Sequence, residues 1–141
     1  MISSSHFHPM LVHFPIALIT FGFLADLFSL FFKKEACLSR SGFYLLITGT
    51  IGALLAWATG MFFTAEMSGS AGEMRETHEL FATITLGLLV LASVLRIVLI
   101  KKPDLVTMKW VAFVLYCLAV FFVSITGYFG GNLVYNYMMP I

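Results

Sequence analysis

The chain has 141 residues, of which 60% are hydrophobic and only 11% are charged. Soluble domains carry about 25% charged residues, so this composition excludes an ordinary soluble protein and indicates a membrane protein whose main partner is the lipid bilayer. The net charge of +1 offers no basic surface, and we therefore exclude nucleic acid as a partner.

Four apolar stretches are long enough to cross a bilayer, which takes about 20 residues. They cover residues 10–32, 42–64, 80–100 and 110–128. The first has neither a basic N-terminal region nor a small-residue cleavage site after it, so we interpret it as a retained helix and not as a signal peptide. The loops are too short to fold alone. The sequence thus predicts an all-α integral membrane protein, a four-transmembrane-helix bundle forming one domain over residues 1–141.

The basic residues indicate how this bundle crosses the membrane. The first and third loops and their borders carry nearly all of them: Lys33, Lys34, Arg40, Lys101, Lys102 and Lys109. The second loop has Arg75 and several glutamates. Because cytoplasmic loops are enriched in lysine and arginine, we predict a multi-pass protein of the bacterial cytoplasmic (inner) membrane with both termini outside.

An internal repeat is suggested by a pattern that occurs twice, H-x3-A-x2-T-x-G-x-L. Its two copies are separated by 65 residues and match His13 with His78, Ala17 with Ala82, Thr20 with Thr85, Gly22 with Gly87, and Leu24 with Leu89. We interpret the chain as two tandem helical hairpins, residues 8–64 and 73–135, forming a parallel repeat about an axis along the membrane normal.

This repeat predicts a cofactor site near the outer face. Ionisable residues inside membranes usually face the bundle interior, so His13 and His78 are expected to face each other across the axis. Two such imidazoles suit the iron of heme b, because bundle cores build cofactor sites from facing helices. Ala17 and Ala82, one turn below each histidine, would leave room for the porphyrin edge.

Other polar residues at the outer end are further candidates for this site. His8 is a donor behind the ligands, a headgroup contact or itself the ligand. His6 is expected in a solvated tail. Arg75 pairs either with a heme propionate or with a nearby glutamate. Asn132 and Tyr135 add polar groups close to the expected site, and the adjacent Gly130–Gly131 is predicted to end the fourth helix.

Two charged residues lie inside the apolar stretches, toward their cytoplasmic ends. Asp26 and Arg96 are predicted to form an ion pair between the first and third helices. Cys37 and Cys117 are expected at different depths, which argues against a disulfide between them. No C-x-x-C or C-x-x-C-H pattern for covalent heme attachment or a cysteine zinc site is present.

The opening HPMLVHFPIAL (8–18) and the closing GGNLVY (130–135) resemble the bacterial membrane proteins grouped as domain of unknown function 2231. The resemblance covers essentially the whole chain, although the end of the chain, NYMMPI, is less glycine-rich than this family suggests. It implies a four-helix membrane protein. It also implies a redox setting, since members are sometimes joined to cytochrome c or Rieske-type domains. The motif contains both His8 and His13 and does not choose between them.

These observations favour a b-type heme protein that transfers single electrons near the outer face. Its partner would be a periplasmic or membrane redox protein such as a cytochrome c or a Rieske-type protein. A second hypothesis is a non-redox structural subunit of a larger membrane complex. A third is a copper or zinc binding protein that uses the histidines with methionines, namely Met10, Met67, Met138 and Met139. An electron carrier or complex subunit fits better than a stand-alone enzyme.

Overall fold

The computed structural model describes residues 7–64 and 66–138, which form four long helices. Helix α1 spans Phe7–Phe31, α2 spans Ala36–Phe63, α3 spans Ser70–Lys101 and α4 spans Val106–Leu133; the short segment η2, Val134–Met138, continues α4. His6 and Met139 lie outside the described residues. All four helices are long and apolar enough to cross a membrane, which confirms the predicted fold class.

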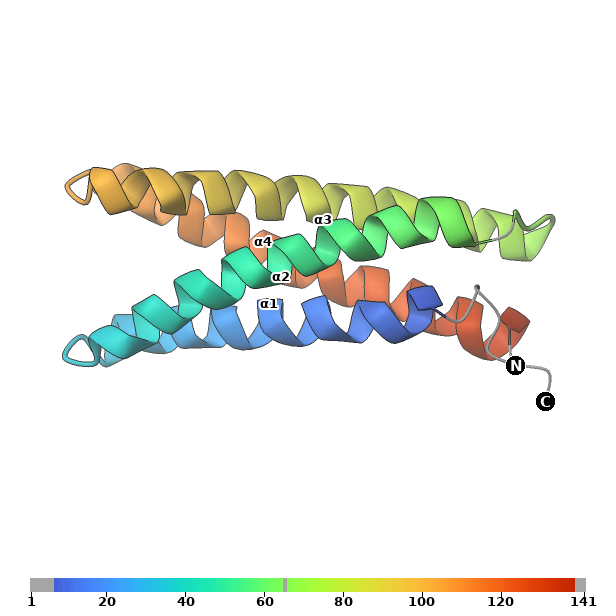
Figure 1. Ribbon diagram of the computed structural model, residues 1–141, viewed down its shortest axis with the longest axis horizontal. Helices are drawn as coiled ribbons and strands as arrows, with labels where there is room; N and C mark the ends of the chain where they lie inside the picture. Colours follow the sequence, from blue (N-terminus) through green and yellow to red (C-terminus); the bar gives the residue numbers. More distant parts are fainter. Residues whose placement is uncertain (1–6, 65, 139–141) are drawn as a thin grey trace.

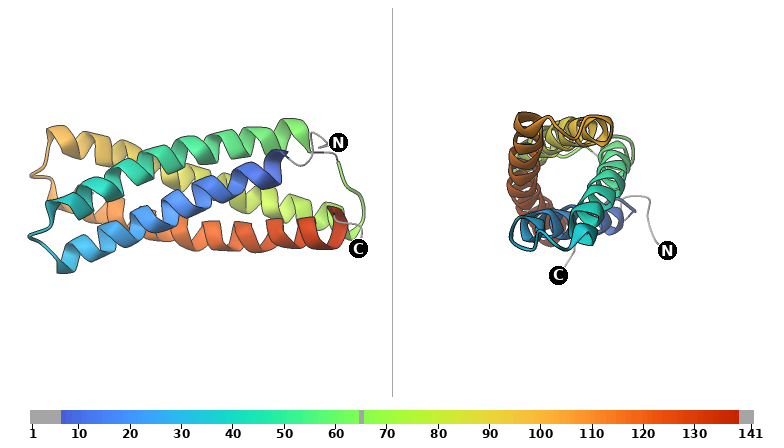
Figure 2. Two further views of the ribbon diagram at one scale, coloured as in Figure 1. Left: turned by 60° about the horizontal axis from the view of Figure 1, so that its bottom comes forward. Right: turned by 90° about the vertical axis from the view of Figure 1, so that its left-hand side faces the viewer.

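The helices form two hairpins, α1 with α2 and α3 with α4, which cross at an angle (Figure 1). The two helices of each hairpin pack together closely, whereas the hairpins meet along narrower seams between α2 and α3 and between α1 and α4. Helices α1 and α3 therefore occupy diagonal corners of the bundle, which Figure 2 shows end-on. The start of α1, the α2–α3 connection and the end of α4 lie at one end, which we call the outer end.

The two hairpins are related by a spacing of 70 residues. Helix α1 ends at Phe31 and α3 at Lys101, 70 positions later; the ends of α2 and α4, Phe63 and Leu133, are also 70 apart. The buried positions repeat with the same spacing, as Ile19 with Leu89 and Leu46 with Tyr116, all at most 1% exposed, and Gly22 with Ala92, Gly42 with Ala112 and Gly49 with Ala119. The predicted spacing of 65 residues is therefore wrong, although two hairpins repeat as expected.

Polar contacts connect the hairpins. The Tyr116 hydroxyl donates to the Ile19 carbonyl across the α1–α4 seam, at 2.9 Å. Across the α2–α3 seam, the Thr50 and Ser93 hydroxyls are 2.9 Å apart, and the Trp57 indole nitrogen donates to the Thr83 hydroxyl at 3.1 Å. Lipid tails are as apolar as leucine, so burial alone gives little drive for helices to associate, and hydrogen bonds of this kind contribute specificity.

The predicted ion pair between the first and third helices is confirmed, near the opposite, inner end. The Arg96 guanidinium donates to both Asp26 carboxylate oxygens, at 2.8 and 3.0 Å. The two cysteines are free, as expected. One expectation about the backbone is wrong: Gly130 and Gly131 do not end a helix, because α4 continues through them to Leu133.

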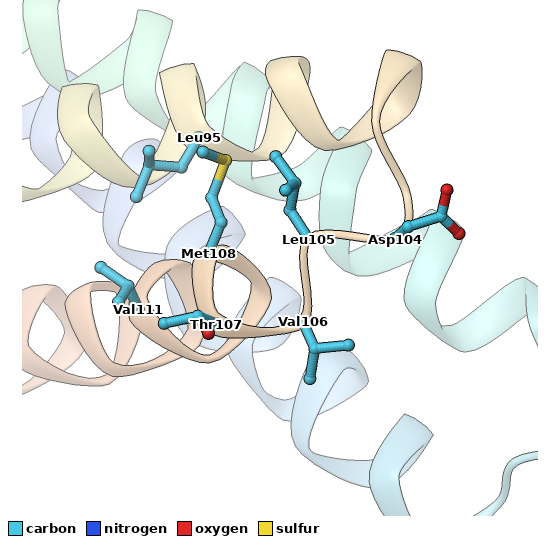
Figure 3. Close-up of a pocket in the computed structure, with 7 residues that line it drawn as sticks. All are labelled: Leu95, Asp104, Leu105, Val106, Thr107, Met108 and Val111. Carbon is cyan, nitrogen blue, oxygen red and sulfur yellow. The ribbon is translucent and has the colours of Figure 1, made fainter.

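A shallow hollow also lies at the inner end, where α3 turns into α4 (Figure 3). Aliphatic side chains and one carboxylate line it: Leu95, Asp104, Leu105, Val106, Thr107, Met108 and Val111. It contains no histidine or cysteine and is far along the helices from the histidines at the outer end. We therefore do not consider it as a cofactor site.

Candidate functional site

Two histidines meet at the outer end of the bundle, His8 from α1 and His78 from α3. Their ring centroids are 6.2 Å apart, and the ring planes are nearly perpendicular, at 81°. They are 70 positions apart in the sequence, so they are symmetry equivalents in the two hairpins. Pro9 is in the first turn of α1, where a missing N–H costs nothing, and the helix can therefore begin just before His8.

His78 is fixed by the second helix of its own hairpin. Its Nδ1 lies 3.0 Å from the carbonyl oxygen of Thr126 on α4. A carbonyl only accepts hydrogen bonds, so Nδ1 carries the proton. In the neutral imidazole the lone pair is then on Nε2, for which no hydrogen-bond partner exists within residues 7–64 and 66–138.

His8 reaches the same protonation pattern through a hydroxyl. Its Nδ1 lies 3.2 Å from Thr59 Oγ1 on α2. The Thr59 hydroxyl hydrogen is already donated to the Ala56 carbonyl, at 2.8 Å, so Oγ1 accepts from Nδ1–H of His8. Ala56 is the equivalent of Thr126, 70 positions earlier. His78 is thus held directly by a backbone carbonyl of α4. His8 is held by the Thr59 hydroxyl, which is itself bound to the equivalent carbonyl of α2. Both histidines leave Nε2 available.

Two equivalent glycines make room for the rings. A Cβ on Gly60 would lie 3.0 Å from Cε1 of His8, and a Cβ on Gly130 would lie 2.9 Å from Cε1 of His78. Any larger residue would move the imidazole. Gly131, the next residue on α4, faces open space, since a Cβ there would meet nothing within 4 Å. Gly60 and Gly130 therefore each admit one ring of the pair.

The prediction that His13 faces His78 is wrong. His13 is exposed, and its Nδ1 lies 2.7 Å from the Pro9 carbonyl in its own helix. Five residues rotate an α-helix by about 140°, so a histidine five positions after the inward-facing His8 points out of the bundle. Ala17 shares the exposed face of His13, so it does not line the interior as expected. Ala82 is half-buried one turn below His78.

The remaining predicted residues are near the outer end but make contacts within their own helix. Arg75 lies 3.6 Å from the Glu79 carboxylate, one turn later on α3. The Asn132 amide donates to the Tyr128 carbonyl. Tyr135, in η2, is 69% exposed. The structure therefore brings together His8 and His78 and leaves Arg75, Asn132 and Tyr135 at the periphery of the pair.

Sequence reasoning missed Gly130 as a ring contact and Thr59 as a hydrogen-bond partner. The ion pair would have revealed Gly130: Asp26 and Arg96 are 70 apart, and the same spacing aligns His8 with His78 and Gly60 with Gly130. It would not have revealed Thr59, which aligns with Phe129. In the described part of the chain, no three histidine, cysteine, aspartate or glutamate side chains are grouped as in an ordinary metal site. The site thus offers two protein nitrogens.

Comparison with known families agrees with this fold. The family model described as "Predicted membrane protein (DUF2231)" matches residues 5–140. The chain belongs to this family. No curated protein and no solved structure matches the chain. Members of this family are grouped as predicted membrane proteins, and the histidine pair is the feature of this member from which we infer its chemistry.

Proposed function

We propose that this DUF2231 protein is a b-type heme protein in which His8 and His78 would hold the heme iron. The observation that supports the proposal most is the pair itself, two imidazoles from diagonal helices with their centroids 6.2 Å apart. Imidazole–metal bonds are about 2 Å long, so two rings that ligate one iron from opposite sides have centroids about 6 Å apart.

The protonation pattern supports the same role. A ligating histidine typically donates its other ring N–H to a carbonyl or another acceptor, which fixes the ring and its tautomer. His78 does this with Thr126 O and His8 with Thr59 Oγ1. Zinc sites usually have three or four protein ligands, whereas two histidine nitrogens would complete the coordination of an iron held by a macrocycle.

The side chains around the two histidines determine which chemistry a bound heme would carry out. When bound, the heme supplies a one-electron couple. Two histidine ligands would leave the iron without a position for an exogenous ligand, which would favour electron transfer over oxygen binding. Thr59 and Thr126 hold the rings, Gly60 and Gly130 admit them, and Arg75 is a cation within reach of the outer surface, where it can neutralise a carboxylate.

Charge distribution supports an outward position for this site. The lysines of the 32–35 and 102–105 connections lie at the inner end, and Arg75 is at the outer end with several glutamates. We propose insertion in the bacterial inner membrane, with the termini and histidines toward the periplasm. The redox partner would then be a periplasmic or membrane protein, such as a cytochrome c or Rieske-type protein, and the chain a carrier or complex subunit.

The test is a reduced-minus-oxidised visible spectrum of the detergent-purified protein from heme-replete cells. We expect b-type bands in the wild type and in His13→Ala, and their loss in His8→Ala and in His78→Ala. His13→Ala is a matched control, because it removes an imidazole from the same helix. A colourless wild type with helical circular dichroism would contradict the heme and favour a structural subunit. Bands that depend on His13 and not on His8 would contradict the ligand assignment.

A further inference from the structure

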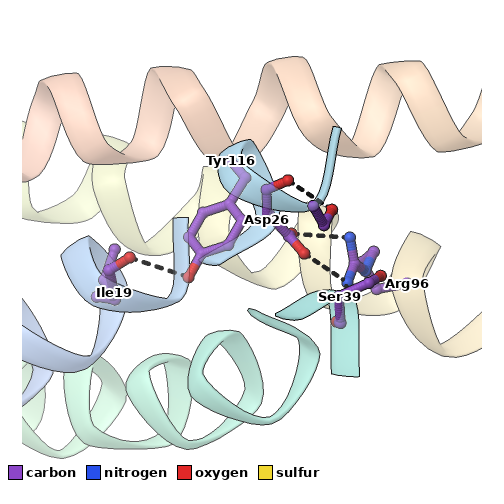
Figure 4. Close-up of polar contacts among 6 residues, drawn as sticks. Ile19, Asp26, Ser39, Arg96 and Tyr116 are labelled. Carbon is purple, nitrogen blue, oxygen red and sulfur yellow. Dashed lines mark hydrogen bonds and ion pairs between the residues drawn. The ribbon is translucent and has the colours of Figure 1, made fainter. Parts of the chain in front are cut away.

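Asp26 and Arg96 are symmetry equivalents that carry opposite charges. The carboxylate accepts two hydrogen bonds from the guanidinium, which also donates to the Ser39 carbonyl at 3.1 Å (Figure 4). The Asp26 side chain is 3% exposed and that of Arg96 is 14% exposed. Both residues belong to membrane-crossing helices, where an isolated charge is costly, so each depends on the other.

The fold makes space for this pair. A Cβ on Gly42 would collide with the Asp26 carboxylate. The equivalent position in the second hairpin, 112, is an alanine, and the equivalent of Gly22 is Ala92. Small residues therefore line the buried faces of both hairpins in the same register. The faces differ in size where Tyr116 of the second hairpin, whose hydroxyl lies against Gly22, replaces Leu46 of the first.

Charge distinguishes the possible partners of each hairpin more sharply than shape does. If two first hairpins paired about the same axis, Asp26 would face another Asp26. Two second hairpins would bring Arg96 against Arg96. Each arrangement would bury two like charges in hydrocarbon, whereas a first hairpin with a second hairpin forms the observed bidentate pair. Buried polar groups are best known for fixing register and partner in this way, because an apolar pair is often at least as stable.

We propose that Asp26 and Arg96 select hairpin partners, so that α1–α2 accepts only a hairpin with the opposite charge at the equivalent position. That hairpin is normally the second half of the same chain. A second copy of the chain can supply it only by exchanging halves. Since the two positions are equivalent, reversing the charges would again bring opposite charges together, with an arginine at position 26 facing an aspartate at position 96.

The first test compares full-length variants in detergent by thermal unfolding. We expect Asp26→Arg and Arg96→Asp to lower the Tm by about 10 °C or more, because each leaves like charges buried. The double variant Asp26→Arg/Arg96→Asp should recover most of that loss. The lysines of the inner connections remain, so the orientation in the membrane is kept. A double variant that unfolds as early as the single variants would overturn the proposal.

The second test separates partner selection from stability. The apolar variant Asp26→Leu/Arg96→Leu should unfold within a few degrees of the wild type but form several times more half-exchanged oligomers, measured by size-exclusion chromatography with light scattering. In addition, differently tagged Asp26→Arg and Arg96→Asp chains should copurify at least about tenfold better with each other than with themselves. An unchanged oligomer distribution together with equal copurification would show that the pair only stabilises the fold.

Discussion

The outer and inner ends of the bundle use the same symmetry differently. At the outer end, equivalent positions carry the same residue, His8 and His78, and each ring has one nitrogen held and one without a partner in the described chain. At the inner end, equivalent positions carry Asp26 and Arg96, which bind each other through two hydrogen bonds, and Arg96 also binds the Ser39 carbonyl. Polar groups that bind each other stabilise the fold, whereas a metal or cofactor binds to a nitrogen lone pair that has no other partner. This difference is why we propose chemistry at the outer end and partner selection at the inner end.

The largest effect should come from the core beside the inner pair. Tyr116 is the largest fully buried side chain, and its hydroxyl binds the Ile19 carbonyl. Tyr116→Ala should lower the free energy of unfolding by about 3–5 kcal/mol, because it leaves a cavity. Tyr128→Ala is the matched control, since Tyr128 is on the same helix but 69% exposed. Steric-trap or denaturant unfolding measures both, and equal losses would contradict the assigned core.

Glycines distinguish the two spacings of the repeat. A Cβ on Gly22 would strike the Tyr116 hydroxyl and lie 2.7 Å from Leu45 Cβ, whereas one on Gly87 would meet nothing within 4 Å. Gly22→Ala should therefore destabilise the protein by about 1–3 kcal/mol through overpacking. Gly87→Ala should be neutral or slightly stabilising, because alanine favours helix. In a 65-residue repeat the two glycines would be equivalent. Similar losses of stability in the two variants would therefore support a spacing of 65 residues.

At the outer end, substitutions of two threonines distinguish the hydrogen bond to a ligating histidine from helix packing. Thr59→Val removes the hydrogen-bond acceptor of His8, while Thr126→Val leaves the carbonyl that accepts from His78. Thr126→Val loses the hydrogen bond that the Thr126 hydroxyl donates to the Phe122 carbonyl and the contact with the Thr85 hydroxyl. We expect heme affinity to fall about tenfold in Thr59→Val, since partners behind a ligand tune its binding. Heme titration of the two apoproteins should show little change in Thr126→Val, and a larger change there would reverse the assignment.

The smallest effect concerns Arg75. Its contact with Glu79 is partly exposed and spans one helical turn, so Arg75→Gln and Glu79→Gln should each change the stability of the apoprotein by less than about 0.5 kcal/mol. If Arg75 also neutralises a heme carboxylate, only Arg75→Gln weakens heme binding, and the weakening diminishes as salt is added. Equal heme affinities in both variants would show that Arg75 binds only Glu79 and no heme carboxylate.

The sequence by itself determined the spans, the hairpins and the ion pair. Long apolar stretches separated by short polar turns have few arrangements in a bilayer, because every backbone polar group must be satisfied within helices. Asp26 and Arg96 are the only charges well inside these stretches, so each had one available partner. The family was also evident from the motifs at the two ends of the chain.

Only the tertiary structure decided which faces of the helices point inward. In a soluble helix the apolar stripe marks the buried face, but here the lipid-facing side chains are as apolar as the core, and that signal disappears. His8 and His13 therefore looked alike in sequence. The choice between a spacing of 65 and one of 70 rotates each aligned position by about 140°, which turns an inward histidine into an outward one. Packing of Ile19, Leu46, Leu89 and Tyr116 against one another fixed the spacing at 70, and with it the pair His8 and His78.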